Sequence, residues 1–412
     1  MARIVLIVPA FPKLSESFLF EKFRRLREAG WDVWVVCRRS ARSEWANFTA
    51  QGEASKLAER VRVCWPQQPK WLAALLAPAA ILRCLARNPA AAWRYLRGPS
   101  PVRRLYADAE LLCLAPDVVH FEFGALAVGR MHLAKFLRCR TLVSFRGYDL
   151  NASGLGNPDY YRDVWKKADA FHFLGEDLRR RARDGGWPEE KPHALIPPAV
   201  DERLYRPREG DGREKSGNAP LRVLSVGRLD WRKGYEYGLE AIRLLVARGV
   251  DVRYRIVGDG DYAEAVAFAR HQLELEPSVE LLGARTSEEV REELCLADVF
   301  LHPAVSEGFS NAVLEAQAMG LPVVCTDAGG LPENVADGET GFVVPRRDPA
   351  ALAEKLKELA RDGALRRRMG EAGRERVLAR FRIESQIEAF GHLYRGLLDG
   401  ARAPATLPAE GR

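Results

Sequence analysis

Two carboxylates in one short segment have the types and spacing to hold a polar ligand. Glu307 and Glu315 lie eight positions apart in SEGFSNAVLE, which follows the apolar run VFLHP. This order predicts a strand, a loop and a helix that Ser310 or Asn311 would cap. Glu307 would lie in the loop at the strand's carboxyl end, and Glu315 about one to two turns into the helix. Because free N–H groups at a helix start attract anions, we expect a ligand with hydroxyls and phosphates, such as a nucleotide-sugar.

A basic pair forms the second pattern. Arg228 and Lys233 lie five positions apart in GRLDWRKG, which predicts a turn between a strand and a helix. An arginine offers a planar fork of donors and a lysine a point charge, so the pair can straddle a diphosphate. There it would stabilise the charge that develops as the bond to a sugar breaks. A solvated turn is the alternative, which Gly227 and the other flanking glycine at the strand end make less favoured.

Paired glycines mark a third strand end. Gly329 and Gly330 lie in DAGGLPE, directly after the predicted strand PVVCT. Their bare backbone can approach a sugar or a phosphate closely. Paired glycines also occur in simple turns, so this motif is weak without the other two.

The elements around these motifs alternate between strands and helices. Strand–helix–strand order over 4–37 predicts parallel pairing, and the pattern continues with a predicted helix over 126–138. The first turn, PAFPKLSES, contains no glycine, which argues against a nicotinamide or flavin site. We predict an α/β fold with one doubly wound domain over 1–200, a linker over 201–220 and a second domain over 221–375. The C-terminal helix, at about 380–400, would join the first domain.

Composition narrows the class of protein. The 412 residues are 47% hydrophobic, which suffices for two large cores. A net charge of +7 and a pI near 9.0 favour anionic partners. Seven cysteines without a CxxC pair predict reduced thiols in the cytoplasm. The first apolar run is too short for a signal peptide, and none reaches the ~18 residues of a membrane span, so we expect a soluble or membrane-surface protein.

The segment 70–104 is basic, rich in aromatic and aliphatic residues, and contains no Asp or Glu. Such a segment can lie in a membrane interface or cradle an anionic acceptor. The alternative is a pair of helices packed on their own domain with a solvated basic face. Nucleic acid is a weaker third partner and we expect none, because no recognised binding motif accompanies the charge.

Several motifs together resemble the GT4 family of retaining glycosyltransferases, which have the GT-B fold. In the second half the matching words are VGRLDWRKG, VGDGD, SEGFSNAVLEAQAMGLPVV and GGLPENVADGETGFVVP, in the family's order. FPKLSESF, VVHFEFG and SFRGYD in the first half resemble bacterial members that build exopolysaccharide and lipopolysaccharide, more loosely. The resemblance implies two Rossmann-like domains that face each other across a cleft.

The resemblance also implies roles for single residues. Arg228 and Lys233 would hold the donor diphosphate, Glu307 would bond hydroxyls of the sugar, and Glu315 would bond the ribose. Arg285 would frame the base. The remaining donor-binding positions are backbone groups in the loops at Gly227, Gly308, Phe309, Ser310, Gly329 and Gly330.

The sequence departs from the family pattern at one position. Many members carry His-Gly where this chain has Arg146 followed by Gly147. Arginine cannot act as a base at neutral pH, so Arg146 would instead bind a phosphate of the donor or the acceptor. His120, at another strand end, is the remaining candidate for proton handling, although a lone strand-end histidine is more often structural.

We therefore predict a retaining transferase that moves a sugar from a nucleoside diphosphate to a saccharide or lipid-linked acceptor. Attack on the face from which the diphosphate leaves, with the leaving phosphate taking the acceptor proton, needs no enzyme nucleophile. We expect no metal and no other cofactor, since cations and helix N-termini supply the positive charge and no DxD pair is present. The alternatives are a nucleotide-sugar epimerase and a non-catalytic homologue that binds carbohydrate.

Overall fold

The computed structural model describes residues 1–48, 51–207 and 219–400. Contacts divide the chain into two compact units. Among the described residues, the first unit holds 1–173, 179–196 and 387–400, and the second holds 174–178 and 197–386. The chain therefore passes between the two units more than once.

The first unit is built on a sheet of seven parallel strands, in the order β3-β2-β1-β4-β5-β6-β7. Its first strand has five consecutive buried residues, Ile4–Val8. Since successive side chains point to opposite faces, both faces of this sheet are covered, which explains the unbroken apolar run. The strands are β1 Arg3–Ala10, β2 Asp32–Arg39, β3 Val61–Val63, β4 Val118–Phe121, β5 Arg140–Phe145, β6 Ala170–Phe173 and β7 His193–Leu195.

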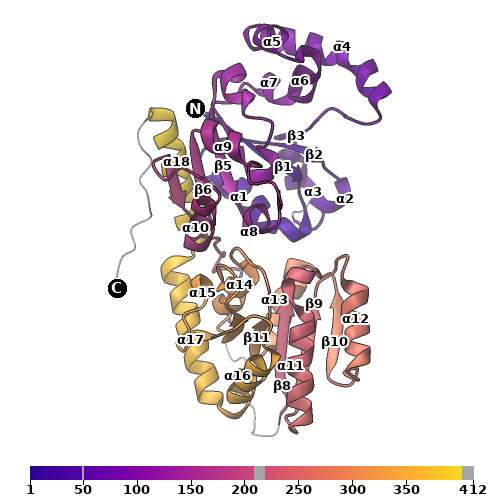
Figure 1. Ribbon diagram of the computed structural model, residues 1–412, viewed down its shortest axis with the longest axis vertical. Coiled ribbons are helices and arrows are strands. Elements are labelled where there is room, and N and C mark those ends of the chain that lie inside the picture. The colour runs from indigo at the N-terminus through magenta and orange to yellow at the C-terminus, as the bar shows by residue number, and fades with distance from the viewer. Residues whose placement is uncertain (49–50, 208–218, 401–412) are drawn as a thin grey trace. The chain divides into compact units, whose positions relative to one another are not determined.

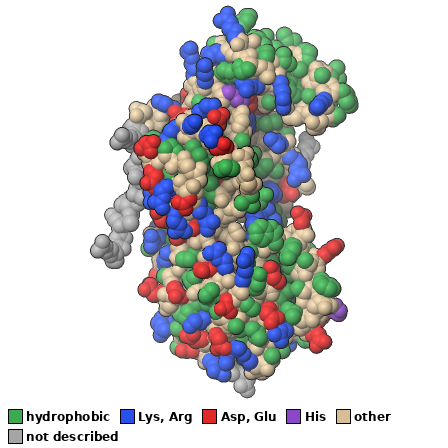
Figure 2. Space-filling view, viewed as in Figure 1, with side chains coloured by type: hydrophobic (Ala, Val, Ile, Leu, Met, Phe, Trp, Pro, Cys, Tyr) green, Lys and Arg blue, Asp and Glu red, His purple; other side chains and the backbone are tan. Residues whose placement is uncertain are grey.

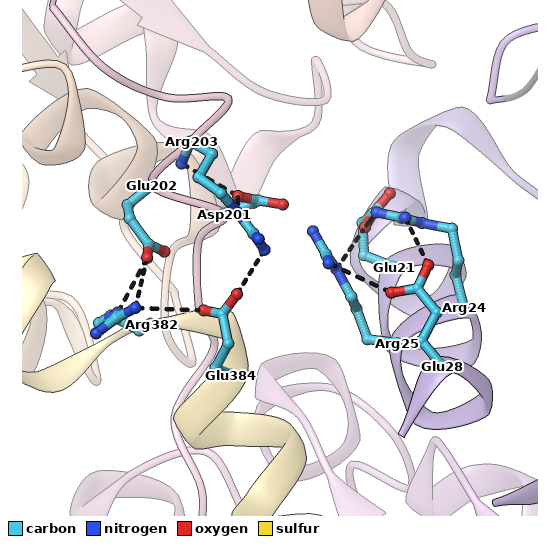
Figure 3. Close-up of polar contacts among 9 residues, drawn as sticks. All are labelled: Glu21, Arg24, Arg25, Glu28, Asp201, Glu202, Arg203, Arg382 and Glu384. Carbon is cyan, nitrogen blue, oxygen red and sulfur yellow. Dashed lines mark hydrogen bonds and ion pairs between the residues drawn. The ribbon is translucent and has the colours of Figure 1, made fainter. Parts of the chain in front are cut away.

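Helices connect these strands (Figure 1). The first, α1, buries Leu19, Phe23 and Leu26, which lie on one face at helical spacing. Its exposed side carries ion pairs of Arg24 with Glu21 and Glu28, drawn in Figure 3. The helices are α1 Ser17–Glu28, α2 Arg42–Trp45, α3 Gln51–Ala58, α4 Lys70–Arg87, α5 Pro89–Leu96, α6 Pro101–Ala107, α7 Ala109–Leu114, α8 Gly147–Asn151 and α9 Arg162–Lys167, together with α10 Glu176–Asp184 and α18 Ile383–Asp399, whose first residues belong to the second unit.

The second unit has a sheet of six parallel strands, in the order β10-β9-β8-β11-β12-β13. The strands are β8 Leu221–Val226, β9 Val252–Val257, β10 Val279–Gly283, β11 Val299–His302, β12 Val323–Thr326 and β13 Gly341–Val344. The helices are α11 Tyr235–Ala247, α12 Ala263–Gln272, α13 Ser287–Leu296, α14 Asn311–Ala318, α15 Leu331–Asn334, α16 Pro349–Arg361 and α17 Gly363–Arg380, with a 3₁₀ turn η4 at Trp231–Lys233. The prediction of two doubly wound Rossmann-like domains is confirmed.

Each sheet changes its winding direction beside its first strand. The order reverses between β1 and β4 in the first unit, and between β8 and β11 in the second. In open parallel sheets, ligands bind outside the carboxyl ends of the strands at this point. The two switch points therefore define where a site should be sought in each unit.

One local prediction is wrong. The helix predicted over 126–138 is replaced by short turns, a 3₁₀ turn at Gly124–Leu126 and a π turn at Ala134–Arg138. Gly129 between them has φ 74°, a left-handed conformation that a continuous helix does not contain.

Across the described residues, no helix is long and apolar enough to cross a lipid bilayer.

The segment predicted as a plain linker is partly built into the second unit. Arg203 bonds Glu384 at 2.5 Å, and Arg382 bonds Glu202 at 2.9 Å (Figure 3). These pairs fasten the stretch that begins at Asp201 to the residues around the start of α18. Residues 208–218 of the predicted linker lie outside the described residues.

Candidate donor-binding site

The switch point of the second unit joins a lysine, a glutamate and a histidine. Lys233 Nζ forms an ion pair with Glu307 Oε2, and His302 Nε2 lies 3.2 Å from the same oxygen. The backbone holds the two loops together, because the N–H groups of Val305 and Ser306 both donate to Arg232 O. Two predicted site residues from distant motifs, Lys233 and Glu307, are therefore in direct contact.

Electrostatics fix the protonation states in this cluster. Burial alone would raise the pKa of Glu307, but Lys233 and the His302 bond hold it well below its usual range. Burial lowers the pKa of His302, so its neutral ring donates Nε2–H to the carboxylate. Glu307 is an anion at neutral pH, with Lys233 as its counter-ion.

Arg228 lies on the same turn, next to Gly227, and its side chain is exposed. Leu229 N–H donates to Asp259 O, and Tyr262 N–H donates to Leu229 O, so the turn after β8 is also fastened to the loop after β9. The structure thus places Arg228 and Lys233 at the two ends of one hydrogen-bonded turn.

The glycines of this region permit contact between backbones. Gly329 has φ 58°, and a Cβ there would lie 2.0 Å from Glu307 O. A Cβ on Gly330 would lie 1.9 Å from Gly308 O. The paired glycines therefore let the loop after β12 pack directly against the loop that carries Glu307.

The start of α14 has the predicted N-cap, but the N–H groups of Gly308 and Ser310 are already bonded within the protein. Ser310 is the N-cap, and its hydroxyl accepts from Val313 N–H at 3.4 Å. Ser310 N–H donates to Asn334 Oδ1 at 3.0 Å, and Gly308 N–H donates to Glu307 Oε1 at 3.1 Å. Among the backbone N–H groups of Gly308, Phe309 and Ser310, that of Phe309 has no partner among the described residues.

Glu315 lies in α14, in a group of its own. Burial raises its pKa to about 7, against the opposing effects of a Tyr205 hydrogen bond and the Arg291 charge. The Arg291 guanidinium lies 5.9 Å from the centre of the Tyr205 ring. Neither partner was predicted from the sequence, and neither were His302 and Asn334. His302, a polar residue that ends an apolar strand, carried a usable signal.

Arg285 follows β10 and pairs with Glu289 of α13 at 3.2 Å. The same turn is closed by a capping box between Thr286 and Glu289. Within the described part of the chain, no contact joins Arg285 to the Lys233 or Glu315 groups.

In the first unit, His120 lies in a buried chain of hydrogen bonds. His120 Nδ1 lies 2.8 Å from Tyr394 Oη, and Nε2 lies 2.7 Å from Ser144 Oγ. Ser144 Oγ lies 2.7 Å from His172 Nδ1, whose Nε2 lies 2.8 Å from Ile196 O. The carbonyl can only accept, so the direction of every bond is fixed and Tyr394 Oη–H donates to His120.

This arrangement bears on the role predicted for His120. The residue is fully buried, and burial lowers its pKa well below the ordinary histidine value. Both ring nitrogens are occupied, so proton exchange with a substrate would require the chain to break. The geometry corresponds to the structural role of a strand-end histidine rather than to proton handling.

Arg146 follows β5 and is held by Glu122. Its Nε donates to Glu122 O at 3.0 Å and its Nη2 to Glu122 Oε2 at 2.9 Å. Lys22 Nζ bonds the other oxygen of that carboxylate at 2.5 Å. The guanidinium also lies over the rings of Phe18, at 4.3 Å, and Phe123, at 5.4 Å. Two cations therefore share one buried carboxylate, and a second buried carboxylate, that of Asp149, accepts from the Arg146 backbone N–H at 2.9 Å.

The described residues contain no group of three or more His, Cys, Asp or Glu side chains that could hold a metal ion. The positive charge in both clusters comes from lysine and arginine side chains instead.

Comparison with known proteins places the chain in a family. Residues 211–376 match the family described as Glycosyl transferases group 1. The putative colanic acid biosynthesis glycosyltransferase WcaL of Salmonella typhimurium is 31% identical over 372 residues, covering 85% of this chain and 89% of WcaL. The amylovoran biosynthesis glycosyltransferase AmsK of Erwinia amylovora is 26% identical over 424 residues, covering 96% and 98%. The chain belongs to the group 1 glycosyltransferase family and is a glycosyltransferase.

Solved structures agree on the fold. Sucrose-phosphate synthase from Thermosynechococcus elongatus superposes with a TM-score of 0.74 at 20% identity, covering 97% of this chain and all of that one. HepE of Anabaena in complex with UDP-glucose gives a TM-score of 0.72 at 17% identity, covering 96% of this chain and all of that one. These likenesses establish the GT-B fold that the motifs predicted.

Proposed function

We propose that this glycosyltransferase moves a sugar from a nucleoside diphosphate to a saccharide or lipid-linked acceptor, with retention at the anomeric carbon. The observation that carries the proposal is the Lys233–Glu307–His302 group at the switch point of the second sheet. A lysine held by an anchored carboxylate, beside the exposed Arg228, suits a ligand that has both phosphates and hydroxyls. The names of the relatives WcaL and AmsK support a role in building cell-surface polysaccharide.

The chemistry we propose places charge stabilisation in the second unit. The bond from the anomeric carbon to the diphosphate oxygen breaks, and Arg228 and Lys233 stabilise the negative charge that the leaving group gains. The acceptor oxygen bonds to the same carbon on the same face, and its proton passes to the leaving phosphate. Glu307, whose pKa is held well below its usual range, stays ionised and serves as a hydrogen-bond acceptor for sugar hydroxyls.

The other donor contacts follow from position. Glu315 would accept from the ribose hydroxyls, Phe309 N–H would donate to a phosphate or the sugar, and Arg285 would lie beside the base. The loops that meet at Gly227, Gly308, Ser310, Gly329 and Gly330 would form the floor of the site. No metal is needed in this scheme, because side-chain cations take that part.

We further propose that Arg146 binds negative charge on the donor or the acceptor. Glu122 fixes its guanidinium, and Phe18 and Phe123 restrict its motion, so little side-chain entropy remains to be lost on binding. Since arginine keeps its proton, Arg146 acts through charge and not as a base. We leave His120 out of the catalytic group.

The cellular setting is also a proposal. The seven cysteines are free thiols, which suits the reducing cytoplasm. A lipid-linked acceptor would bring the enzyme to the cytoplasmic face of a membrane, and the acid-free segment 70–104 suits peripheral contact with anionic lipid.

A donor panel tests the proposed function. The full-length protein is incubated with UDP-glucose, UDP-galactose, UDP-N-acetylglucosamine, GDP-mannose or GDP-fucose, with and without an envelope lipid and saccharide extract. We expect one donor to release its nucleoside diphosphate only with the extract, and proton NMR to show the donor's anomeric configuration in the product. Conversion of a donor without the extract would indicate an epimerase, and binding without conversion would indicate a carbohydrate-binding homologue. An inverted product would overturn the mechanism.

A further inference from the structure

The outer face of α4 is apolar, which is unusual for a surface helix. Of its 18 residues only Ala80 and Cys84 are buried. Trp71, Leu75 and Leu82 are 69%, 69% and 67% exposed, and their spacing of four and seven puts them on one side of the helix. A helix that packs on a domain normally turns polar residues outward.

The neighbouring helices extend this surface. Trp93 of α5 is 56% exposed, and Val102 of α6 is 48% exposed. Helices α4, α5 and α6 pack on one another, and Figure 2 shows hydrophobic and basic side chains prevailing over the region that Figure 1 labels α4 to α6. Trp and Leu on one surface, with basic residues among them, are typical of helices that lie in a membrane interface.

Six of the seven cations of this segment fall into two groups. Arg83 bonds Glu110 at 2.5 Å and Arg94 bonds Phe136 O at 2.7 Å, so these two hold the helices to the rest of the first unit. The other group is exposed, and its members form no ion pair among the described residues. It comprises Lys70, Arg87, Arg97 and Arg103.

We propose that α4, α5 and α6 dock on the surface of an anionic lipid bilayer. Trp71, Leu75, Leu82 and Trp93 enter the boundary between headgroups and acyl chains, and the exposed cations contact anionic headgroups. Arg97 already lies 5.6 Å over the Trp93 ring, which pairs an apolar anchor with a charge. The proposal rests on the proposed function only for the lipid-linked acceptor that would give the docking a purpose.

The charge of this surface favours an anionic bilayer over a second copy of this chain as its partner. Residues 70–107 contain no Asp or Glu. In a symmetric dimer the same surface meets itself, so these cations would face each other without a carboxylate from the segment between them. An anionic bilayer complements both the charge and the apolar residues.

The test is co-sedimentation of the full-length protein with vesicles, without donor or acceptor. We expect binding to phosphatidylglycerol–phosphatidylcholine vesicles that weakens with salt, and little binding to pure phosphatidylcholine. Each basic residue near an anionic surface contributes about fivefold. The triple variant Arg87→Gln, Arg97→Gln, Arg103→Gln should therefore bind about 100-fold more weakly. Trp71→Ala with Leu75→Ala should also weaken binding, and that loss should persist at high salt.

Matched controls come from the second unit. Arg361→Gln, Arg367→Gln, Arg368→Gln removes three exposed charges, and Phe268→Ala with Leu296→Ala removes exposed apolar side chains. These variants should bind vesicles as the wild type does. Wild-type protein that ignores phosphatidylglycerol vesicles, or controls that lose binding equally, would overturn the proposal. So would a wild-type dimer in analytical ultracentrifugation that dissociates in the Trp71→Ala, Leu75→Ala variant. Donor-induced thermal shifts, measured without vesicles, report on the donor site separately.

Discussion

The two units contain the same three residue types at corresponding switch points, in opposite surroundings. In the first unit, Glu122 after β4 meets Lys22 from the helix after β1 and lies 3.6 Å from His120. In the second, Glu307 after β11 meets Lys233 from the turn after β8 and lies 3.2 Å from His302. The Lys22 and Glu122 side chains are 3% and 0% exposed, and those of Lys233 and Glu307 are 21% and 15% exposed.

This difference in exposure separates a structural cluster from a binding cluster. The buried group is covered by α18, whose Phe390 ring lies 3.5 Å from Lys22 Nζ and whose Tyr394 bonds His120. Nothing in the second unit closes the Lys233 group in this way among the described residues, so its charges can be shared with a ligand. The same Lys–Glu–His set thus stabilises one unit and, in our account, binds substrate in the other.

The largest expected effect is on the stability of the first unit. Lys22→Ala leaves Glu122 with one of its two cations and empties space beneath Phe390. Breaking a buried pair by removing one partner costs about 3–5 kcal/mol, so we expect a loss of that order in chemical denaturation. The double variant Lys22→Met, Glu122→Gln removes both charges and keeps an acceptor for Arg146, so it should be less damaging. A loss below about 1 kcal/mol for Lys22→Ala would show that the Lys22–Glu122 pair contributes no more to stability than an ordinary surface pair.

The second-largest expected effect is a loss of catalytic activity. Lys233→Ala and Glu307→Ala should each reduce kcat/KM by about 100- to 1,000-fold, the usual loss when one charge-stabilising group is removed. Because the pair is partly exposed, the free energy of unfolding should change by about 1 kcal/mol or less. Lys355→Ala, which breaks the exposed pair with Glu358, is the matched control and should retain full activity. Near-normal rates in both site variants would remove this cluster from the mechanism.

A smaller expected effect is a dependence of donor affinity on pH. Burial raises the pKa of Glu315 to about 7, so the carboxyl is largely protonated at pH 6. If the ribose hydroxyls donate to the ionised form, donor affinity should rise as pH increases from 6 to 8, by up to about tenfold per unit below the pKa. Calorimetric titration in two buffers should detect proton release on binding at pH 6.

Glu315→Gln is the control for this pH effect. The glutamine does not titrate, so the pH dependence of donor affinity should disappear.

Protein stability gives a second measurement, and the direction of its pH dependence can be stated. Since the folded state keeps a proton that an unfolded glutamate loses near its ordinary pKa of 4.5, Glu315 makes the free energy of unfolding fall as pH rises from about 4.5 to 7. A pH dependence that survives in the glutamine variant would assign the titration to another group.

The smallest effect tests the helix cap beside the site. Ser310→Ala removes the hydroxyl that accepts Val313 N–H and should cost about 1 kcal/mol of stability. Asp348→Ala removes the equivalent bond to Ala351 N–H at α16, away from the cluster. Both should lower stability alike, but only Ser310→Ala should also weaken donor binding. Equal donor affinity in the two variants would make the cap a purely structural feature.

Short-range patterns were readable from the sequence. Strand ends, the Ser310 cap and the position of Lys233 and Glu307 follow from apolar runs, capping chemistry and motif order. The helix predicted over 126–138 failed because its apolar spacing was outweighed by Gly129, which adopts a left-handed conformation there. Periodicity alone does not reveal which conformation a glycine takes.

Long-range partners could not be predicted in this way. Tyr394 bonds His120 across 274 positions, and Asn334 bonds Ser310 across 24. Tyr205, next to Glu315, lies in a stretch whose composition predicts only a linker. These long-range partners determine which side chains are buried. The Lys22 cluster and the Lys233 cluster differ in this burial.

We assign donor binding to the Lys233 cluster and not to its buried counterpart. The most direct test of this assignment is the thermal shift that the active nucleotide-sugar produces in wild type, Lys233→Ala and Lys355→Ala. A ligand that binds only the folded state raises Tm, so the wild type and Lys355→Ala should shift equally. Lys233→Ala should show little or no shift at the same donor concentration. A full shift in Lys233→Ala would show that Lys233 does not hold the donor.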